Sequence, residues 1–172
     1  MKGTIVNCLQ ELVINKFGKE KWEKSLEEAG VDPNSVFLMT SDIDDAVVVG
    51  VIKSVCKNLG ITLEQAADAF GDYWINVYAQ KFYRSFFAPK TAKDFLLNMD
   101  FVHVAMTNTL KDSRPPRFTC EMEDKKTLVM HYKSKRGLID FVVGLVNGVG
   151  KYYKENLSVS KIGADKVRIV FL

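Results

Sequence analysis

The chain has 172 residues, 47% of them hydrophobic, and its 24 Lys and Arg side chains against 21 Asp and Glu give a net charge of +3. This length suits one domain with a sizeable core, and the apolar content excludes an intrinsically disordered chain. The small charge does not indicate nucleic-acid binding, so we expect no nucleic-acid partner. The apolar runs are too short for a membrane helix and the first residues lack a signal peptide, so we expect a cytoplasmic protein without membrane insertion.

The first two-thirds of the chain predicts helices, because apolar residues recur there at helical spacing. The first helix covers 5–13, and the second ends near Gly30. A third begins at Ser41, which forms a capping-box pattern with Asp44, and ends at Gly60.

Two further helices are predicted before the pattern changes. One begins at Thr62 and runs to Tyr78, and the next begins at Thr91 and runs to Leu110. Each start carries a capping-box partner three residues later. The sequence therefore predicts an N-terminal part that is entirely helical.

The segment Arg114-Pro115-Pro116-Arg117 cannot continue a helix, because proline lacks the amide donor and restricts the residue before it. The periodicity beyond it predicts two strands, one long helix and two more strands, at residues 118–122, 128–134, 138–152, 157–162 and 167–171. Helices grouped before an antiparallel sheet indicate an α+β fold, here with a small four-stranded sheet and a long helix.

His103 lies among apolar residues on a predicted helix. It is either a buried structural histidine or a metal or cofactor ligand, since neutral imidazole commonly binds metals. A zinc site needs about four protein ligands, and the chain has only two histidines. Heme needs only an axial ligand, because the porphyrin supplies the other nitrogens.

Tyr132, Ser134 and Arg136 alternate along a predicted strand. In an extended strand, residues two apart share a face and are separated by roughly 6–7 Å. Two hydroxyls and a guanidinium in one row suit a pair of carboxylates. The alternative is an ordinary sheet face that runs into a basic, solvated turn.

Gly144 and Gly148, four apart on the last predicted helix, also have two interpretations. They allow close packing of the helix against the sheet, or they leave room for a flat ligand. For catalysis, Cys120 and His131 are a possible nucleophile and base, but nothing in the sequence places them together. No phosphate loop, dinucleotide fingerprint or nucleophile elbow occurs, so we expect no enzyme.

In combination, these features resemble the heme-nitric oxide/oxygen-binding (H-NOX) domain, the heme domain shared with soluble guanylate cyclase. The similarity covers essentially the whole chain in order and spacing. The motifs that carry it are Met-Lys-Gly-Thr-Ile-Val at the start, Met99-Asp100-Phe101-Val102-His103, Arg114-Pro115-Pro116-Arg117 and Tyr132-Lys133-Ser134-Lys135-Arg136. The resemblance implies a single domain over 1–172. A distal helical subdomain would cover 1–60 and a proximal subdomain with the sheet 61–172, with heme between them.

The resemblance also implies roles for individual residues. His103 would be the axial ligand of heme b (iron protoporphyrin IX). The two heme propionates would be held by Tyr132, Ser134 and Arg136, and the porphyrin would be distorted by Pro116 and Ile5.

The predicted distal pocket favours nitric oxide. Oxygen-binding members of the family have a tyrosine that donates a hydrogen bond to the ligand, and the matching residue here is Phe141, which has no donor. Nitric oxide, like carbon monoxide, would not need one. The rest of the pocket would be lined by Leu9, Trp74, Tyr78 and Leu145. The alternative is an oxygen sensor in which Tyr78 or Trp74 supplies the donor.

The resemblance therefore implies a gas sensor. Nitric oxide would release the proximal His103 and let the heme flatten, and the two parts of the chain would shift. By similarity to stand-alone bacterial members, the signal would pass in trans to a histidine kinase or a cyclic-di-GMP enzyme. A heme-free module that only binds a partner is the remaining alternative.

Overall fold

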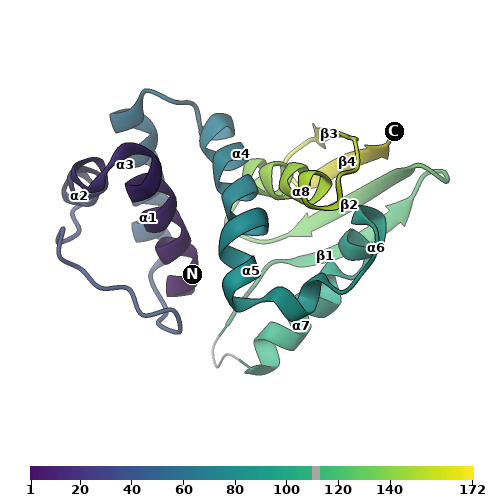
Figure 1. Ribbon diagram of the computed structural model, residues 1–172, viewed down its shortest axis with the longest axis horizontal. Helices are drawn as coiled ribbons and strands as arrows, with labels where there is room; N and C mark the ends of the chain where they lie inside the picture. Colours follow the sequence, from purple (N-terminus) through teal and green to yellow (C-terminus); the bar gives the residue numbers. More distant parts are fainter. Residues whose placement is uncertain (110–112) are drawn as a thin grey trace. The chain divides into compact units, whose positions relative to one another are not determined.

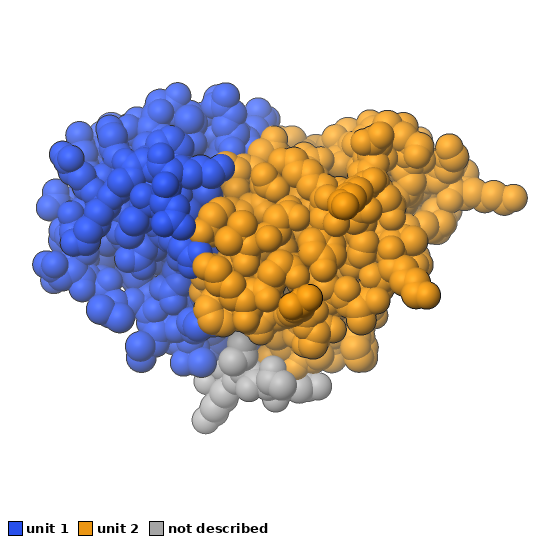
Figure 2. All heavy atoms as spheres, in the orientation of Figure 1, with its two compact units in different colours: residues 1–66, 112–114 blue, residues 67–111, 115–172 orange. Residues whose placement is uncertain are grey.

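A computed structural model describes residues 1–109 and 113–172 (Figure 1). The chain divides into two compact units, one of residues 1–66 with 112–114 and the other of residues 67–111 with 115–172 (Figure 2). The first unit is helical, and the second contains a four-stranded antiparallel sheet. The predicted α+β fold is confirmed.

The helical unit contains α1 (Gly3–Phe17), α2 (Lys19–Glu28) and α3 (Asp45–Leu59). One side of each helix is apolar and buried, as the periodicity predicted. The buried residues of this unit include Val6, Leu12, Val13, Trp22, Leu26, Val48, Val51, Ile52 and Val55.

Both ends of α3 follow from local chemistry. The side chain of Asp44 accepts a hydrogen bond from the Ala46 N–H at 2.6 Å, so Asp44 is the N-cap. The prediction that Ser41 begins this helix was wrong by one turn. Gly60 ends it with φ +64°, in the left-handed region that favours glycine.

A long helical run follows, made of α4 (Leu63–Tyr73), the π-turn η1 (Trp74–Tyr78) and α5 (Ala79–Phe82). The predicted capping box is confirmed, because the Gln65 N–H donates to Thr62 Oγ1 at 3.2 Å and the Thr62 N–H donates to Gln65 Oε1 at 2.9 Å. The prediction of a plain helix to Tyr78 was wrong, since the winding changes at Trp74. A short 3₁₀ turn, η2 (Arg84–Phe87), comes next.

The helix predicted from Thr91 is in fact two helices, α6 (Ala92–Leu97) and α7 (Met99–Thr109), separated at Asn98. Thr91 caps α6 as predicted, since its hydroxyl accepts from the Asp94 N–H at 3.0 Å. Leu110, the predicted end of this segment, lies outside the described residues.

No single helix among residues 1–109 and 113–172 is long and apolar enough to cross a membrane. The helices Asp45–Leu59 and Leu63–Phe82 have the necessary length and composition only as a broken pair.

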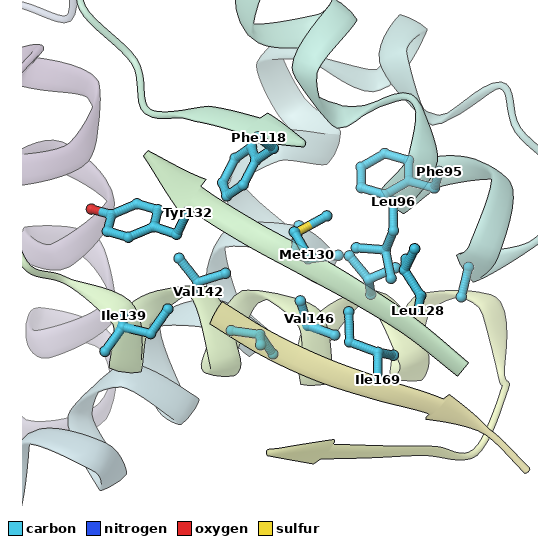
Figure 3. Packing of buried hydrophobic residues seen from close by; sticks show 14 residues of the cluster. Phe95, Leu96, Phe118, Leu128, Met130, Tyr132, Ile139, Val142, Val146 and Ile169 are labelled. Carbon is cyan, nitrogen blue, oxygen red and sulfur yellow. The ribbon is translucent and has the colours of Figure 1, made fainter. Parts of the chain in front are cut away.

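The sheet has the order β1-β2-β4-β3, with all neighbours antiparallel. Its strands are β1 (Arg117–Met122), β2 (Thr127–Lys133), β3 (Leu157–Ile162) and β4 (Lys166–Phe171). The helix α8 (Ile139–Tyr153) joins β2 to β3 and packs against the sheet. Figure 3 shows the resulting core, in which side chains of the sheet meet those of α6 and α8.

The small residues of α8 pack against a helix backbone and leave no room for a flat ligand at this point. A Cβ atom at Gly144 would lie 2.1 Å from the Ala67 carbonyl oxygen, and one at Gly148 would lie 2.6 Å from the Gly71 carbonyl oxygen. Gly71 on α4 faces Gly144 in the same way, with 2.1 Å between its added Cβ and the Gly144 carbonyl carbon. The close-packing interpretation is therefore confirmed, but the partner is α4 and not the sheet.

We expect Gly144→Ala to destabilise the protein, because the methyl group can be accommodated only if one helix backbone moves. Overpacking of this kind costs roughly 1–3 kcal/mol. The measurement is the free energy of unfolding in urea. Gly50→Ala on α3 is the control, since its Cβ would meet only the Ala29 Cβ at 3.9 Å and the change should stabilise by roughly 0.5–1 kcal/mol. Equal stability of Gly144→Ala and wild type would contradict the close crossing.

Candidate functional site

The site is centred on His103, which α7 places beside the segment that leads into β1. His103 Nδ1 lies 2.6 Å from the carbonyl oxygen of Pro116. A carbonyl can only accept, so Nδ1 carries the proton and donates it. The lone pair of the imidazole is therefore on Nε2, which is the nitrogen available to a ligand.

Burial lowers the pKa of His103, and the hydrogen bond to the Pro116 carbonyl opposes this effect. The imidazole is thus neutral at neutral pH, which is the form that binds metals. No group of three or more His, Cys, Asp or Glu side chains in the described parts of the chain could hold a metal ion alone. A single neutral histidine, oriented by a backbone carbonyl, fits a cofactor that brings its other ligands, as heme does.

Asp100 joins the same helix to the first strand. Its carboxylate accepts from Arg117 Nε at 2.7 Å, from Arg117 Nη2 at 2.6 Å and from the Phe118 N–H at 2.9 Å. These bonds, led by the two from Arg117, hold the pKa of Asp100 far below its usual range. Residues three apart share a helix face, so Asp100 and His103 fix α7 to the chain around the start of β1 at two adjacent points.

An aromatic chain connects His103 to one of the predicted propionate ligands. The His103 ring lies 5.3 Å from the ring of Phe118, which lies 6.0 Å from the ring of Tyr132. Phe118 and Tyr132 are paired across β1 and β2. In Figure 3 the Tyr132 hydroxyl points away from Met130 and the rest of the apolar cluster. The phenol oxygen is therefore at the margin of the core. Phe118 contacts both the Tyr132 ring and the His103 ring.

Ser134 and Arg136 do not continue the strand. β2 ends at Lys133, and the Arg136 N–H donates to Ser134 Oγ at 3.2 Å in a turn. Gly137, with φ +64°, supports that turn. The prediction of one extended row from Tyr132 to Arg136 was wrong, because a side-chain hydrogen bond competes with the strand conformation.

Four of the predicted distal residues lie in the sheet unit. Trp74 stacks on Tyr78 at 5.4 Å between ring centroids and on Phe70 at 5.9 Å. Phe70 in turn meets Phe141 edge-on at 5.4 Å. Leu145, one turn further along α8 than Phe141, is half-buried and packs against the core of this unit.

The other two predicted contacts belong to the helical unit. Ile5 and Leu9 both lie on α1, four residues apart, and therefore share one face of that helix.

The structure separates the two residues of the enzyme alternative. Cys120 is opposite Met130 in the sheet and His131 is opposite Thr119, so their side chains point to opposite faces. Burial, followed by the charge of Asp100, raises the pKa of Cys120, which disfavours the reactive thiolate. His131 lies near Glu121 instead, with 3.9 Å between Nε2 and Oε2.

Sequence reasoning missed Asp100 and Phe118. Asp100 lies one helical turn before His103, and Arg117 directly follows the two prolines. The histidine motif and the proline motif thus carry side chains of opposite charge. That pairing was the available signal. Phe118 carried no signal beyond strand alternation, because its role depends on the register of β1 with β2.

Comparison with known proteins gives a consistent assignment. A family model described as Haem-NO-binding matches residues 2–161. Soluble guanylate cyclase gcy-34 of Caenorhabditis elegans is 31% identical over 172 residues, which cover 94% of this chain and 24% of the relative. For gcy-35 of the same organism the identity is 26%, over 96% of this chain and 25% of the relative. The chain thus spans about a quarter of the length of these curated relatives.

Solved structures agree over nearly the full chain. An oxygen-binding H-NOX domain related to soluble guanylate cyclases, in its oxygen complex, is 31% identical with a TM-score of 0.82. The match covers 99% of this chain and 95% of that one. A variant H-NOX from T. tengcongensis is 30% identical with a TM-score of 0.85, covering 99% and 97% of the two chains.

The ionised Asp100 should contribute stability that depends on pH. Its pKa is lowered on folding, so the contribution is complete above the unfolded value, about 3.9, and is lost as the pH falls from there through the folded pKa. We expect Asp100→Asn to be less stable than wild type at pH 7, with a smaller difference at pH 3. Thermal unfolding at both pH values measures this, and a difference that does not change with pH would contradict it.

Proposed function

The chain belongs to the Haem-NO-binding (H-NOX) family of heme-binding gas-sensor domains, and from this premise we propose that it senses nitric oxide through a heme b held by His103. The observation that carries the proposal is the hydrogen bond from His103 Nδ1 to the Pro116 carbonyl. It leaves one neutral nitrogen for a metal and fixes the ring that bears it.

When bound, heme would supply an iron that can bind an imidazole nitrogen and a diatomic gas. His103 would present Nε2 to that iron. Pro116, whose carbonyl orients His103, would also distort the porphyrin with its rigid ring, and Ile5 on α1 is the second residue proposed to distort it. Pro116 would therefore both orient the iron ligand and shape the cofactor.

Tyr132, Ser134 and Arg136 would bind the two propionates. A phenol hydroxyl at the margin of the core, a serine hydroxyl and a guanidinium all donate to carboxylates, and arginine can do so with two parallel bonds. The observed turn supports this role, because it brings Ser134 Oγ to 3.2 Å from the Arg136 backbone nitrogen. Two of the donors would then lie in one compact loop.

Selectivity for nitric oxide is proposed from the composition of the distal residues. Phe141 offers no hydrogen-bond donor, and it lies edge-on against Phe70 in an aromatic cluster. Oxygen gains negative charge when it binds ferrous iron and needs a donor in such surroundings, since an unmet polar group in an apolar pocket is costly. Leu9 and Leu145 would contribute further apolar side chains to the distal pocket. The second candidate is oxygen sensing with Tyr78 or Trp74 as donor, because both rings would line the distal wall and belong to the same ring cluster.

The signal would begin at His103. Release of the imidazole would leave α7 held by the Pro116 carbonyl and by the Asp100 contacts, so any movement of His103 would be transmitted to β1 through these bonds. A ligand can shift the two states only by its differential affinity for them. The predicted recipients are a histidine kinase or a cyclic-di-GMP enzyme. The domain itself would sense and not catalyse.

The heme proposal is tested by the absorption spectrum of protein purified with heme available. We expect a strong Soret band that is lost in His103→Gly and restored by added imidazole, which replaces the missing ligand. His131→Gln is the matched control and should keep the band. A wild-type protein without a Soret band would support the heme-free module, and an unchanged spectrum in His103→Gly would refute the axial role.

Phe141→Tyr should raise oxygen affinity, because it adds the missing donor. A hydrogen bond to a charged acceptor contributes roughly 1.5–3 kcal/mol, which is about ten- to a hundred-fold in affinity. Oxygen titration of the ferrous protein measures this, with Phe171→Tyr on β4 as a control that should not change it. A stable oxygen complex in the wild type would favour the oxygen-sensing candidate, and an unaltered affinity in Phe141→Tyr would contradict the pocket assignment.

A further inference from the structure

The helical run Leu63–Phe82 changes its winding where it carries Trp74 and Tyr78. In the π-turn Trp74–Tyr78, the Ala79 N–H donates to the Trp74 carbonyl, five residues back. Turns of this type are rare within α-helices and often mark functional sites. Specific contacts are therefore needed to favour the wider turn at this position.

Two side-chain amides provide these contacts. Asn76 Nδ2 lies 3.2 Å from the carbonyl oxygen of Asp72 and 2.9 Å from its Oδ1. Gln80 Nε2 lies 2.9 Å from the carbonyl oxygen of Ile75. Each amide thus donates to a helix carbonyl four or five residues earlier, within the π-turn or just before it.

Asn76 also connects the π-turn to the neighbouring helix. Its Nδ2 lies 3.2 Å from the Gly148 carbonyl oxygen on α8. The same helix carries Phe141, and its close crossing with α4 at Gly144 keeps the two backbones in contact. The Asn76 amide therefore fixes the π-turn relative to α8, the helix that carries Phe141.

The winding determines how the aromatic rings align. In an α-helix of 3.6 residues per turn, residues four apart differ by about 40° around the axis. Trp74 and Tyr78 are four apart and stand at the two ends of the π-turn, so the wider winding changes this offset between them. Across the turn their rings stack, with 5.4 Å between centroids and 23° between planes. The stacked pair therefore depends on the winding of this turn.

We propose that Asn76 and Gln80 are positioning residues for the distal gas site, because their amides hold the π-turn that aligns Trp74 and Tyr78. The inference rests on the proposed function, since it assigns those two rings to the distal wall. Without the amides, the turn relaxes toward α-helical winding. Tyr78 then rotates away from the Trp74 ring, and the shape of the pocket changes.

The test uses the heme-loaded protein as its carbon monoxide complex, with the variants Asn76→Ala and Gln80→Met. Gln80→Met keeps the side-chain length and removes the donor. The first readout is the ¹H–¹⁵N cross-peak of the Trp74 indole, which is distinguished from that of Trp22 in a Trp22→Phe protein. The second is the C–O stretching frequency. We expect both variants to shift the Trp74 cross-peak and the C–O frequency and to leave the Trp22 cross-peak in place.

Asn147→Ala is the matched control. Asn147 Nδ2 donates to Asp68 Oδ1 at 3.0 Å, so it links the same two helices without touching a helix carbonyl. This variant should leave both readouts unchanged, even if its melting temperature falls. If Asn76→Ala does not fold, Gln80→Met carries the test, because its hydrogen bond lies within one helical run.

Unchanged Trp74 cross-peaks in folded variants would overturn the inference. A shifted cross-peak with an unchanged C–O frequency would also overturn it, because the amides would then hold the turn without positioning the gas site. A protein that binds no heme would refute the proposed function separately. The indole cross-peak, which needs no heme, would still report whether the amides hold the turn.

Discussion

The hydrogen bond from His103 to the Pro116 carbonyl is the constraint on which the rest of the site depends. It selects the tautomer, sets the ring orientation and joins α7 to the residue that precedes β1. The Asp100–Arg117 pair reinforces this junction from the next turn of the helix. Proline at this position cannot donate a backbone hydrogen bond of its own. The carbonyl is therefore its main polar contribution, and it is used to orient the histidine.

Much of the fold could be predicted from the sequence where local chemistry decides. The Thr62–Gln65 capping box and the Gly60 stop are set by residues that contact each other within a few positions. The π-turn at Trp74 and the break at Asn98 were missed, because periodicity does not report a change of winding. Tertiary contacts, such as the bond from Asn76 to Gly148 seventy-two residues away, hold the π-turn in place.

The candidate site divides in the same way. The motifs around His103 and Tyr132 were visible as residue types at fixed spacing, and the family assignment that they suggested is confirmed. The geometry of these motifs was harder to predict from the sequence. The turn at Ser134 was misassigned as strand although Gly137 was a signal for it. The bridging position of Phe118 depends on strand register, which pairs it with Tyr132.

The strand order β1-β2-β4-β3 has a mechanical consequence for the junction at Pro116. β1 is an outer strand, hydrogen-bonded to β2 alone, whereas β2 and β4 are each paired on both sides. A displacement of β1 strains one ladder of hydrogen bonds, while the same displacement of β2 would strain two. The helix α7, which carries His103, is thus attached to a strand that is paired on one side only and is displaced more easily than the central strands. The doubly paired strands β2 and β4 form the stiffer part of the sheet, relative to which α7 can move.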